Sequence, residues 1–583
     1  MKRARELLSI LRPHRKKIIF AGISILAVNL TGLAFPWGIK IIIDEVLVKK
    51  DFFLLNSLAG ALVLIFLIQF YCGFMREYLV SSVGENVVCE LRNRLYWHIE
   101  RLSVKYIEDT PIGKIISGVI GDVESIRNFL FGGLIDFIYS FLNVFFVLII
   151  LLFLDWKLTL VSLIFLPAFG LTFFKLTPRL QKKFGAVREK YAELTAHLNE
   201  VCIGIRVVCG FGKERYEADR FNSTQSKILK NSMAGHRLTI GLWMGSELVS
   251  SLGLVTIIWF GTRAVFSGRI TPGTLMAFYS YTGMLFFPVI KMTIINNFYQ
   301  EAAVAMERID RILAEEPAVK ESLNPVKINK VKGNVIFDGV SFSYDGKREV
   351  LSGIDIGVKA SQTIALVGKS GAGKTTMINL LLRFYDPDKG GIFIDGYNIC
   401  DLDLNSYRSS IAMVLQDDYL FNLSVRENIL YGKPQASFDE VVRAACLANA
   451  HQFITELADG YDTEIGEGGV KLSFGQRQRI SISRAIIRDP AILILDEATS
   501  CVDSETERLI IEGAYKNVIC GRTTFIIAHR LSAITYADRI IFIEGGRIIE
   551  EGAHQHLLDK KGRYWKMWTE QTRYSFTSKV PAA

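Results

Sequence analysis

The sequence has none of the cysteine spacings that mark disulfide frameworks or zinc sites. Its 8 cysteines are scattered through 583 residues, and no two of them form a C-x-x-C pair. We therefore expect small apolar thiols in a reducing compartment, with neither disulfides nor thiolate-bound metal. The chain also lacks internal repeats and low-complexity segments, which excludes repeat architectures and long disordered tracts.

A cleavable leader is not evident either. A basic segment follows Met1 and runs into a long apolar stretch without a small-residue cleavage site, so we expect a retained membrane helix. The chain is 50% hydrophobic and its mean hydropathy is +0.27, which is high for a soluble enzyme. A net charge of +9 fits nucleic acid or a membrane surface, and the Lys and Arg residues beside long apolar runs favour the membrane.

Six apolar segments in the N-terminal half are each long enough to cross a bilayer. They lie at 18–43, 54–75, 131–154, 156–177, 239–266 and 274–297. Residues 2–17 are predicted to form a basic amphipathic helix on the membrane surface, with a solvated basic tail as the alternative. The positive-inside rule places this segment and the basic stretch 92–114 in the cytoplasm, and an even number of spans returns the C-terminal half there. The polar stretches 76–130 and 178–238 have helical periodicity, so the membrane helices should continue beyond the bilayer.

A glycine-rich turn follows a short apolar strand, 363–367, in the C-terminal half. Glycines let consecutive backbone N–H groups converge on phosphate oxygens, and the following helix directs its positive end at the same anion. Lys374 is predicted to reach the β- and γ-phosphates of ATP, and the Thr375 hydroxyl to bind Mg²⁺. A chance glycine-rich turn is the alternative, but the strand before it and the apolar helix after it argue against that alternative. The residues predicted to bind ATP through this G-x-x-x-x-G-K-T motif are Gly368, Lys369, Ser370, Gly371, Ala372, Gly373, Lys374, Thr375 and Thr376.

A second apolar strand, 491–495, ends in two acids. Asp496 is predicted to hold Mg²⁺ through water, and Glu497 to orient and polarise the water that attacks the γ-phosphate. The alternative is an ordinary strand end. The phosphate-binding motif upstream favours the catalytic interpretation.

Between the two strands lies Leu472-Ser473-Phe474-Gly475-Gln476, which resembles the signature of the ATP-binding cassette (ABC) family, usually written Leu-Ser-Gly-Gly-Gln. Phe474 departs from the family pattern, in which a glycine stands there. Ser473 and Gly475, which approach the γ-phosphate in the family, are both present, so we expect activity to survive.

The resemblance implies roles for further residues. Tyr344 would stack on adenine, Gln416 would meet Mg²⁺ and the membrane domain, Asp503 would touch a partner subunit, and His529 would contact the γ-phosphate. The implied catalytic set is Glu497, His529, Lys374 and Gln416. The implied metal ligands are Thr375, Gln416 and Asp496.

The resemblance covers the whole chain and implies an exporter half-transporter, similar to bacterial lipid A exporters and homodimeric multidrug exporters. Two stretches, 463–467 and 106–113, resemble segments typical of exporters, and short helices are expected near 107–120 and 208–222. The predicted fold is an all-α, six-helix transmembrane domain fused to a cytosolic α/β P-loop ATPase domain with a mainly parallel sheet. Its predicted parts are a transmembrane domain at 1–315, a linker at 316–332, a nucleotide-binding domain at 333–575 and a tail at 576–583.

The predicted function is ATP-driven export or flipping of an amphipathic, lipid-like substrate across the plasma membrane. ATP and Mg²⁺ are the implied cofactors. A second identical subunit is the implied partner, because in this family the signature of one chain completes the phosphate site of the other. A multidrug or peptide exporter is the alternative, and an ATP-gated channel or regulator is an alternative of another class, against which Glu497 argues. No nucleic-acid partner is predicted.

Four charged residues in or beside the apolar segments are candidates for a substrate cavity. Asp136, Glu247 and Lys291 lie within predicted spans, and Arg76 lies at the inner end of the second. Each charge at a helix centre costs about 2.5–3.5 kcal/mol on insertion scales, so its position calls for an explanation. The charges either pair with one another or snorkel to an interface, or else Arg76 and Lys291 meet an anionic head group.

Overall fold

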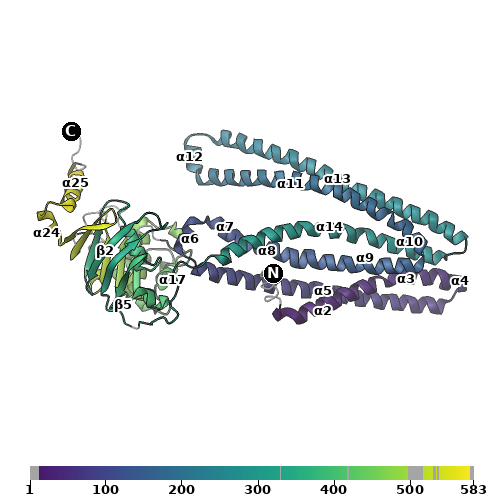
Figure 1. Cartoon of the computed structure of the whole chain (residues 1–583), viewed down its shortest axis with the longest axis horizontal. Coiled ribbons are helices and arrows are strands. Elements are labelled where there is room, and N and C mark those ends of the chain that lie inside the picture. Colours follow the sequence, from purple (N-terminus) through teal and green to yellow (C-terminus); the bar gives the residue numbers. More distant parts are fainter. Residues whose placement is uncertain are drawn as a thin grey trace. The chain divides into compact units, whose positions relative to one another are not determined.

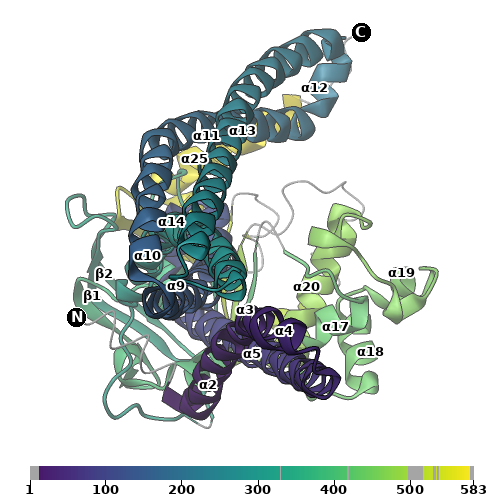
Figure 2. The ribbon, with the colours of Figure 1, turned by 90° about the vertical axis from the view of Figure 1, so that its right-hand side faces the viewer.

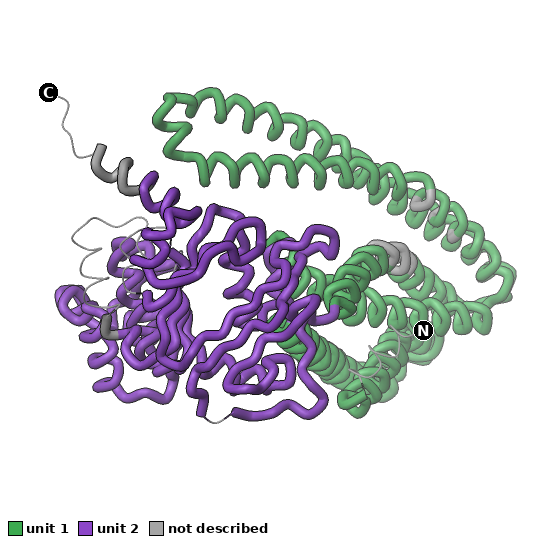
Figure 3. Tube along the Cα trace, turned by 60° about the vertical axis from the view of Figure 1, so that its left-hand side comes forward, with its two compact units in different colours: residues 1–101, 110–315 green, residues 102–109, 316–583 purple. Residues whose placement is uncertain are grey.

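The computed structural model describes residues 12–328, 330–415, 419–496, 516–528, 534 and 537–577. Its contacts divide the chain into two units (Figure 3). The first consists of Met1–Arg101 and Thr110–Glu315, and the second of Leu102–Asp109 and Glu316–Ala583. The segment predicted on the membrane surface, 2–17, lies outside the described residues as far as residue 11.

The described residues of the first unit form helices joined by short turns, and none of them forms a strand (Figure 1). Each of the six predicted apolar segments lies in one long helical stretch. In chain order these stretches are η1 (Arg12–His14), α2 (Arg15–Gly32), α3 (Ala34–Ile41), η2 (Ile42–Val46) and α4 (Leu47–Lys49); α5 (Phe52–Arg101); α7 (Ile112–Ser117), η3 (Gly118–Asp122), α8 (Val123–Arg127), η4 (Asn128–Leu134) and α9 (Ile135–Leu154); α10 (Trp156–Leu163) and α11 (Phe165–Ile203); α13 (Glu214–Phe266); and α14 (Pro272–Ala314).

Four helical stretches among the described residues have both the length and the hydropathy of a membrane span. They are Arg12–Lys49, Phe52–Arg101, Ile112–Leu154 and Glu214–Phe266. The other two predicted segments, 156–177 and 274–297, are helical within α10–α11 and α14.

The longest helices exceed the thickness of a bilayer. α5 has 50 residues and α13 has 53. At 1.5 Å per residue each is about 75–80 Å long, more than twice the ~30 Å hydrocarbon core. α11 and α13 run side by side and are joined through the short helix α12 (Ile205–Gly210), as Figure 2 shows. The polar stretches 76–130 and 178–238 are thus largely helical.

The second unit contains two sheets. The larger has the order β10-β9-β3-β8-β7-β6, in which β9 to β6 are parallel and β10 is antiparallel at the edge. The smaller, β2-β1-β4-β5, is antiparallel. The strands are β1 (Val335–Phe342), β2 (Leu351–Val358), β3 (Thr363–Val367), β4 (Lys389–Ile394), β5 (Tyr397–Asn398), β6 (Ile411–Val414), β7 (Ile492–Asp496), β8 (Thr523–Ile527), β9 (Arg539–Glu544) and β10 (Arg547–Gly552).

Burial explains why the sequence revealed one sheet more clearly than the other. All five residues of β3 and of β8 are buried, which gives the continuous apolar runs of a parallel sheet covered on both faces. β2 alternates between buried and exposed positions, because one face of the antiparallel sheet is solvated. That weaker pattern was not recognised, so the prediction of a mainly parallel sheet omitted the smaller sheet.

Helices complete the second unit. Ile364 and Leu366 of β3 join the apolar core that surrounds α15, while Ala365 and Val367 join a second core under α17 to α20. The helical elements are α6 (Val104–Asp109), α15 (Lys374–Leu381), η5 (Ile399–Asp401), α16 (Leu404–Ser409), α17 (Val425–Leu430), α18 (Phe438–Leu447), α19 (His451–Thr455), η6 (Gly460–Asp462), η7 (Glu467–Gly469), α20 (Phe474–Arg488), α22 (Lys516–Ile519), α24 (His554–Asp559) and α25 (Arg563–Thr577).

Candidate functional site

The glycine-rich turn connects β3 to α15 and takes a conformation that requires glycine. Gly373, directly before α15, has φ +106°, and a Cβ there would lie 2.6 Å from Leu351 Cδ2 and 3.2 Å from the Val350 carbonyl. A Cβ on Gly368 would collide with the Ile543 carbonyl. Side chains are therefore excluded at both ends of the turn, which leaves backbone N–H groups to face an anion.

Lys374 is held inside this turn. It is only 4% exposed, and its ammonium donates to the carbonyls of Gly368 at 2.9 Å and Lys369 at 3.1 Å. It is also the first residue of α15, so its charge adds to the positive end of that helix. A buried cation, a helix N-terminus and a turn free of side chains together fit a phosphate chain such as that of ATP.

The strand register brings the predicted metal ligands to the same edge of the sheet. Leu366 of β3 and Asp496 of β7 both pair with Ile527 of the intervening strand β8. Asp496 therefore lies level with the end of β3, about 10 Å away at two strand spacings. Thr375 is exposed in the first turn of α15, just after the phosphate turn. A hydroxyl and a carboxylate are oxygen ligands of the kind that Mg²⁺ prefers, so these residues fit the ion.

Tyr344, predicted to stack on adenine, is attached to the phosphate-binding helix. Its hydroxyl donates to Thr376 Oγ1 at 3.2 Å and accepts from Asn379 at 3.4 Å. Its ring centroid lies 4.9 Å from that of Phe342 and 5.1 Å from that of Tyr385. The ring is therefore oriented by an aromatic cluster beside the turn.

Helix α6 contacts this aromatic cluster. The sequence did not reveal this contact in detail. The ammonium of Lys105 donates to the backbone carbonyl of Tyr344. Burial, and after it the nearby carboxylates of Glu108 and Asp109, raises the pKa of Tyr385 to about 12. The available signals were the exporter-like stretch 106–113 and the short helix predicted near 107–120.

The signature residues form the start of α20. Ser473 is the N-cap residue, and its hydroxyl accepts from the Gln476 backbone N–H at 3.3 Å while the Gln476 side chain accepts from the Ser473 N–H at 2.9 Å. Phe474 is half-buried, with the Arg477 guanidinium 5.8 Å from its ring, and Gly475 is buried. The phenylalanine thus packs into the first turn while Ser473 stays exposed at the helix end.

Four predicted site residues lie outside the described residues. They are Gln416, Glu497, Asp503 and His529.

The structure brings together three of the four charged candidates for the substrate cavity. Lys291 of α14 and Asp136 of α9 form an ion pair at 2.9 Å. Arg76 contacts the carboxylate of Glu77 and lies 5.0 Å from the ring of Tyr139, one turn beyond Asp136. Pairing, one of the two interpretations of these charges, is therefore what the structure shows for Lys291 and Asp136.

Glu247 does not join this group. It is exposed on α13, and among the described residues it makes no hydrogen bond or ion pair. Its neighbours on the exposed side of α13, Trp243, Met244 and Leu248, are apolar.

Sequence reasoning missed a large cleft in the first unit. Its volume is about 950 Å³, and its lining comes from η3, α8, α11, α13 and α14. Two ion pairs border it, Arg188–Glu301 at 3.5 Å and Arg308–Asp122 at 3.3 Å. Gln181 and Gln300 add polar groups, whereas Leu180, Phe184, Leu242 and Val304 add apolar ones. These residues lie in polar helical sequence, where nothing distinguishes a lining residue from a solvated one.

Comparison with known proteins agrees with this combination of helices and nucleotide fold. Residues 18–289 match the family model described as ABC transporter transmembrane region, and residues 351–500 match the model described as ABC transporter. The chain is 35% identical to an ATP-dependent lipid A-core flippase of Desulfotalea psychrophila over 96% of this chain and 97% of that one. It is 34% identical to the putative multidrug export ATP-binding/permease protein YgaD of Bacillus subtilis, over 96% and 98% of the two chains.

A solved structure has the same fold. A bacterial Atm1-family ABC exporter with ATP bound superposes with a TM-score of 0.80 at 28% identity, over 98% of this chain and 99% of that one. The transmembrane region places the protein in the membrane, and the ATPase domain is on the cytoplasmic side in this family. The chain belongs to the ABC transporter family, as an ATP-hydrolysing exporter that carries its transmembrane region and its ATPase domain in one polypeptide.

Proposed function

We propose that two copies of this chain form an exporter that flips or exports an amphipathic, lipid-like substrate across the plasma membrane by alternating access. The observation that carries the substrate class is the cleft of about 950 Å³. It combines ion-paired arginines and amides with apolar side chains, and α11, α13 and α14, which line it, also carry exposed apolar residues. Such a lining suits a molecule with a charged head and an apolar body. The names of the relatives, a lipid A-core flippase and a multidrug exporter, fit the same class.

A dimer is proposed because two separate parts of the fold suit the two sides of an ATP molecule. Lys374 and the phosphate turn can hold one side of ATP, and the exposed, Ser473-capped end of α20 presents a second positive helix terminus. In the proposed dimer, α20 of one copy faces the phosphate turn of the other. Each copy contributes half of two equivalent sites.

Within each proposed site, different residues bind the phosphates, hold the metal and activate the attacking water. The backbone N–H groups of the turn and Lys374 bind the phosphates, and Thr375 and Asp496 supply oxygen ligands for the metal. Mg²⁺, when bound, neutralises charge on the β- and γ-phosphates. Glu497 takes a proton from the water that attacks the γ-phosphorus, while the bond from that phosphorus to the ADP oxygen breaks.

Helix α6 offers a route by which the nucleotide affects the membrane helices. It belongs to the second unit, yet in the chain it lies between the long helix α5 and the helical stretch that begins with α7. Its Lys105 contacts the carbonyl of Tyr344, the residue predicted to meet adenine. A shift of Tyr344 on nucleotide binding would therefore pull directly on α6.

The test is ATPase activity and lipid translocation by the full chain in liposomes. Anionic lipids, neutral lipids, cationic drugs and peptides are compared as stimulators, and accessibility of a fluorescent lipid to an external quencher reports flipping. We expect ATP-dependent flipping with stimulation by anionic lipids, and neither activity in Lys374→Ala. Stimulation by drugs alone would support a multidrug exporter. An ATP-dependent ion conductance without hydrolysis would support a channel.

A multidrug exporter is the second candidate, and Glu247 is the observation that favours it. This carboxylate, which has no ion pair with another described residue, lies among exposed apolar side chains, with Trp243 one turn away on the same helix. A carboxylate beside an aromatic ring suits a lipophilic cation. Glu247→Gln should then weaken stimulation by cationic drugs and leave stimulation by anionic lipids unchanged.

A further inference from the structure

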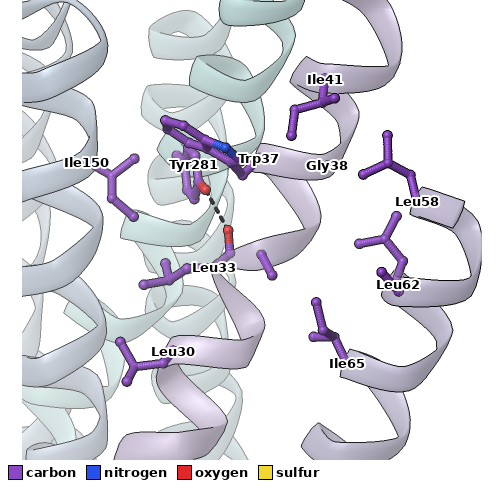
Figure 4. Close-up of a pocket in the computed structure, with 12 residues that line it drawn as sticks. Leu30, Leu33, Trp37, Gly38, Ile41, Leu58, Leu62, Ile65, Ile150 and Tyr281 are labelled. Atoms are coloured by element: carbon purple, nitrogen blue, oxygen red, sulfur yellow. Dashed lines mark hydrogen bonds between the residues drawn. The ribbon is translucent and has the colours of Figure 1, made fainter. Parts of the chain in front are cut away.

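An apolar pocket of about 390 Å³ lies in the first unit, between the first two membrane helices and the third and sixth (Figure 4). Leu58, Leu62 and Ile65 of α5 point toward α2 and α3, and Leu30, Trp37 and Ile41 line the pocket from those two helices. Ile150 of α9 and Tyr281 of α14 close one side. Its volume is at the lower end of the range for ligand pockets.

A break in the first membrane helix creates this pocket. α2 ends at Gly32, α3 begins at Ala34, and Pro36 removes a backbone donor just after the break. Tyr281 donates its hydroxyl to the carbonyl of Leu33, the residue between α2 and α3, 2.5 Å away. Accordingly α2 packs closely along α5, whereas α3 packs mainly on α14 and leaves a gap toward α5.

The lining fits an apolar ligand such as a hydrocarbon chain. Its polar side-chain groups are the indole N–H of Trp37 and the hydroxyl of Tyr281, and the hydroxyl is already bonded to Leu33. Water needs two to four polar partners to remain in a cavity, and this lining does not provide them. The remaining lining is aliphatic carbon from Leu, Ile, Ala and Gly residues.

The position of the pocket in the bilayer identifies the source of that hydrocarbon. The ATPase domain is cytoplasmic and follows the C-terminal end of α14, so the start of α14, where Tyr281 lies, is in the outer half of the membrane. Exposed aromatic side chains surround the pocket on α3 and α5, including Trp37 and Phe66. Acyl chains of the outer leaflet therefore reach it without crossing a polar region.

A cation stands beside the pocket. The Lys40 ammonium lies 4.9 Å from the centroid of the Trp37 ring, and Lys40 makes no ion pair with another described residue. A lysine near the membrane surface attracts anionic lipid head groups. The apolar wall and the Lys40 charge are arranged as the tail and head of a phospholipid are.

We propose that this pocket binds an acyl chain of an anionic phospholipid from the outer half of the membrane, with the head-group phosphate facing Lys40. The site is separate from the polar cleft and holds no charged lining residue, so the lipid is a bound companion of the transporter and not the transported molecule. The proposal does not depend on which substrate is exported.

The test uses the full-length protein in nanodiscs that contain a phosphatidylglycerol with a photoreactive group near the end of one acyl chain. Labelled peptides are mapped by mass spectrometry, and we expect labels on the segments around Ile41, Leu62 and Ile65. Ala61→Phe fills the pocket from α5, and Ala34→Leu fills it from α3. Ala59→Phe is the matched control, because Ala59 is exposed on the same helix but does not line the pocket.

Labelling should fall to background in both filling variants and persist in Ala59→Phe. Lys40→Gln should reduce labelling by phosphatidylglycerol about fivefold relative to phosphatidylcholine, as expected for loss of one surface lysine. Unchanged labelling in both filling variants would place the acyl chain elsewhere and overturn the proposal. So would disulfide cross-linking between copies through cysteines introduced at Leu62 and Ile65, because a helix of a second copy would then occupy the pocket.

Discussion

Removing Lys291 tests whether the charges inside the membrane unit serve the fold or the cargo. Its ammonium pairs with Asp136 at 2.9 Å, with the two side chains 36% and 45% exposed. Lys291→Ala leaves Asp136 without this partner. A lone Asp at a helix centre costs about 2.5–3.5 kcal/mol. Asp136 is half-exposed, which lowers this cost, so we expect about 1–2 kcal/mol.

The measurement is thermal unfolding of the reconstituted protein, in which 1 kcal/mol shifts the midpoint by about 2–4 °C for a domain of 150–250 residues. The matched variant is Lys291→Ala with Asp136→Asn, which removes both charges. If the pair is structural, the double variant should recover about 1 kcal/mol relative to Lys291→Ala, as coupled neighbours do. A double variant that unfolds as early as the single one would refute the pairing argument.

Stimulation of the ATPase activity by substrates tests whether Lys291 has a second role in binding the substrate. If Lys291 also meets the substrate, stimulation by anionic lipids should fall more than stimulation by neutral or cationic drugs, and the double variant should not restore it. Equal loss for all substrates in Lys291→Ala, with recovery in the double variant, would mark a structural lysine. No loss in either would remove Lys291 from the transport pathway.

Four further predictions concern the nucleotide-binding unit. Glu497→Gln should bind ATP but hydrolyse it about 10²–10⁴-fold more slowly, because the general base is lost, and near-normal turnover would contradict that role. Lys374→Ala and Ser473→Arg should each abolish cooperative ATP hydrolysis. Mixed dimers of the two variants should regain activity, because one of their two sites is intact. Mixed dimers that are no more active than either variant would exclude sites shared between two copies. Tyr344→Ala should weaken binding of fluorescent ATP by about 1–3 kcal/mol of lost stacking, and Tyr344→Phe should not, since it keeps the ring. The Asp395 carboxylate is partly buried, which raises its pKa, but it accepts the N–H groups of Lys332 at 2.6 Å and Asn334 at 2.9 Å, so its pKa is lowered overall. The stability that the ionised Asp395 carboxylate contributes is therefore complete above its unfolded pKa of about 3.9 and is lost as pH falls through its lower folded pKa. Asp395→Asn should remove this loss, so the free energy of unfolding should depend less on pH in the acid range.

The sequence by itself determined the features whose physics is local. The phosphate turn could be recognised because its glycines, its lysine and the flanking strand and helix lie within 14 consecutive residues, 363–376. The membrane helices could be recognised because length and apolar composition suffice to cross a bilayer. The capped start of α20 at Ser473 depends on residues three positions apart, so it too is written in the sequence.

Only the tertiary structure decided which distant side chains meet. Lys291 and Asp136 are 155 residues apart, and Lys105 and Tyr344 are 239 apart, so no periodicity relates them. The cleft and the apolar pocket escaped prediction for the same reason. Each depends on how separate elements pack: the pocket exists because α3 leaves α5 for α14 after the break at Leu33, where Tyr281, 248 residues away, supplies the hydrogen bond. Local sequence fixes the conformation of a segment, whereas the spaces between segments are set by contacts that no single segment contains.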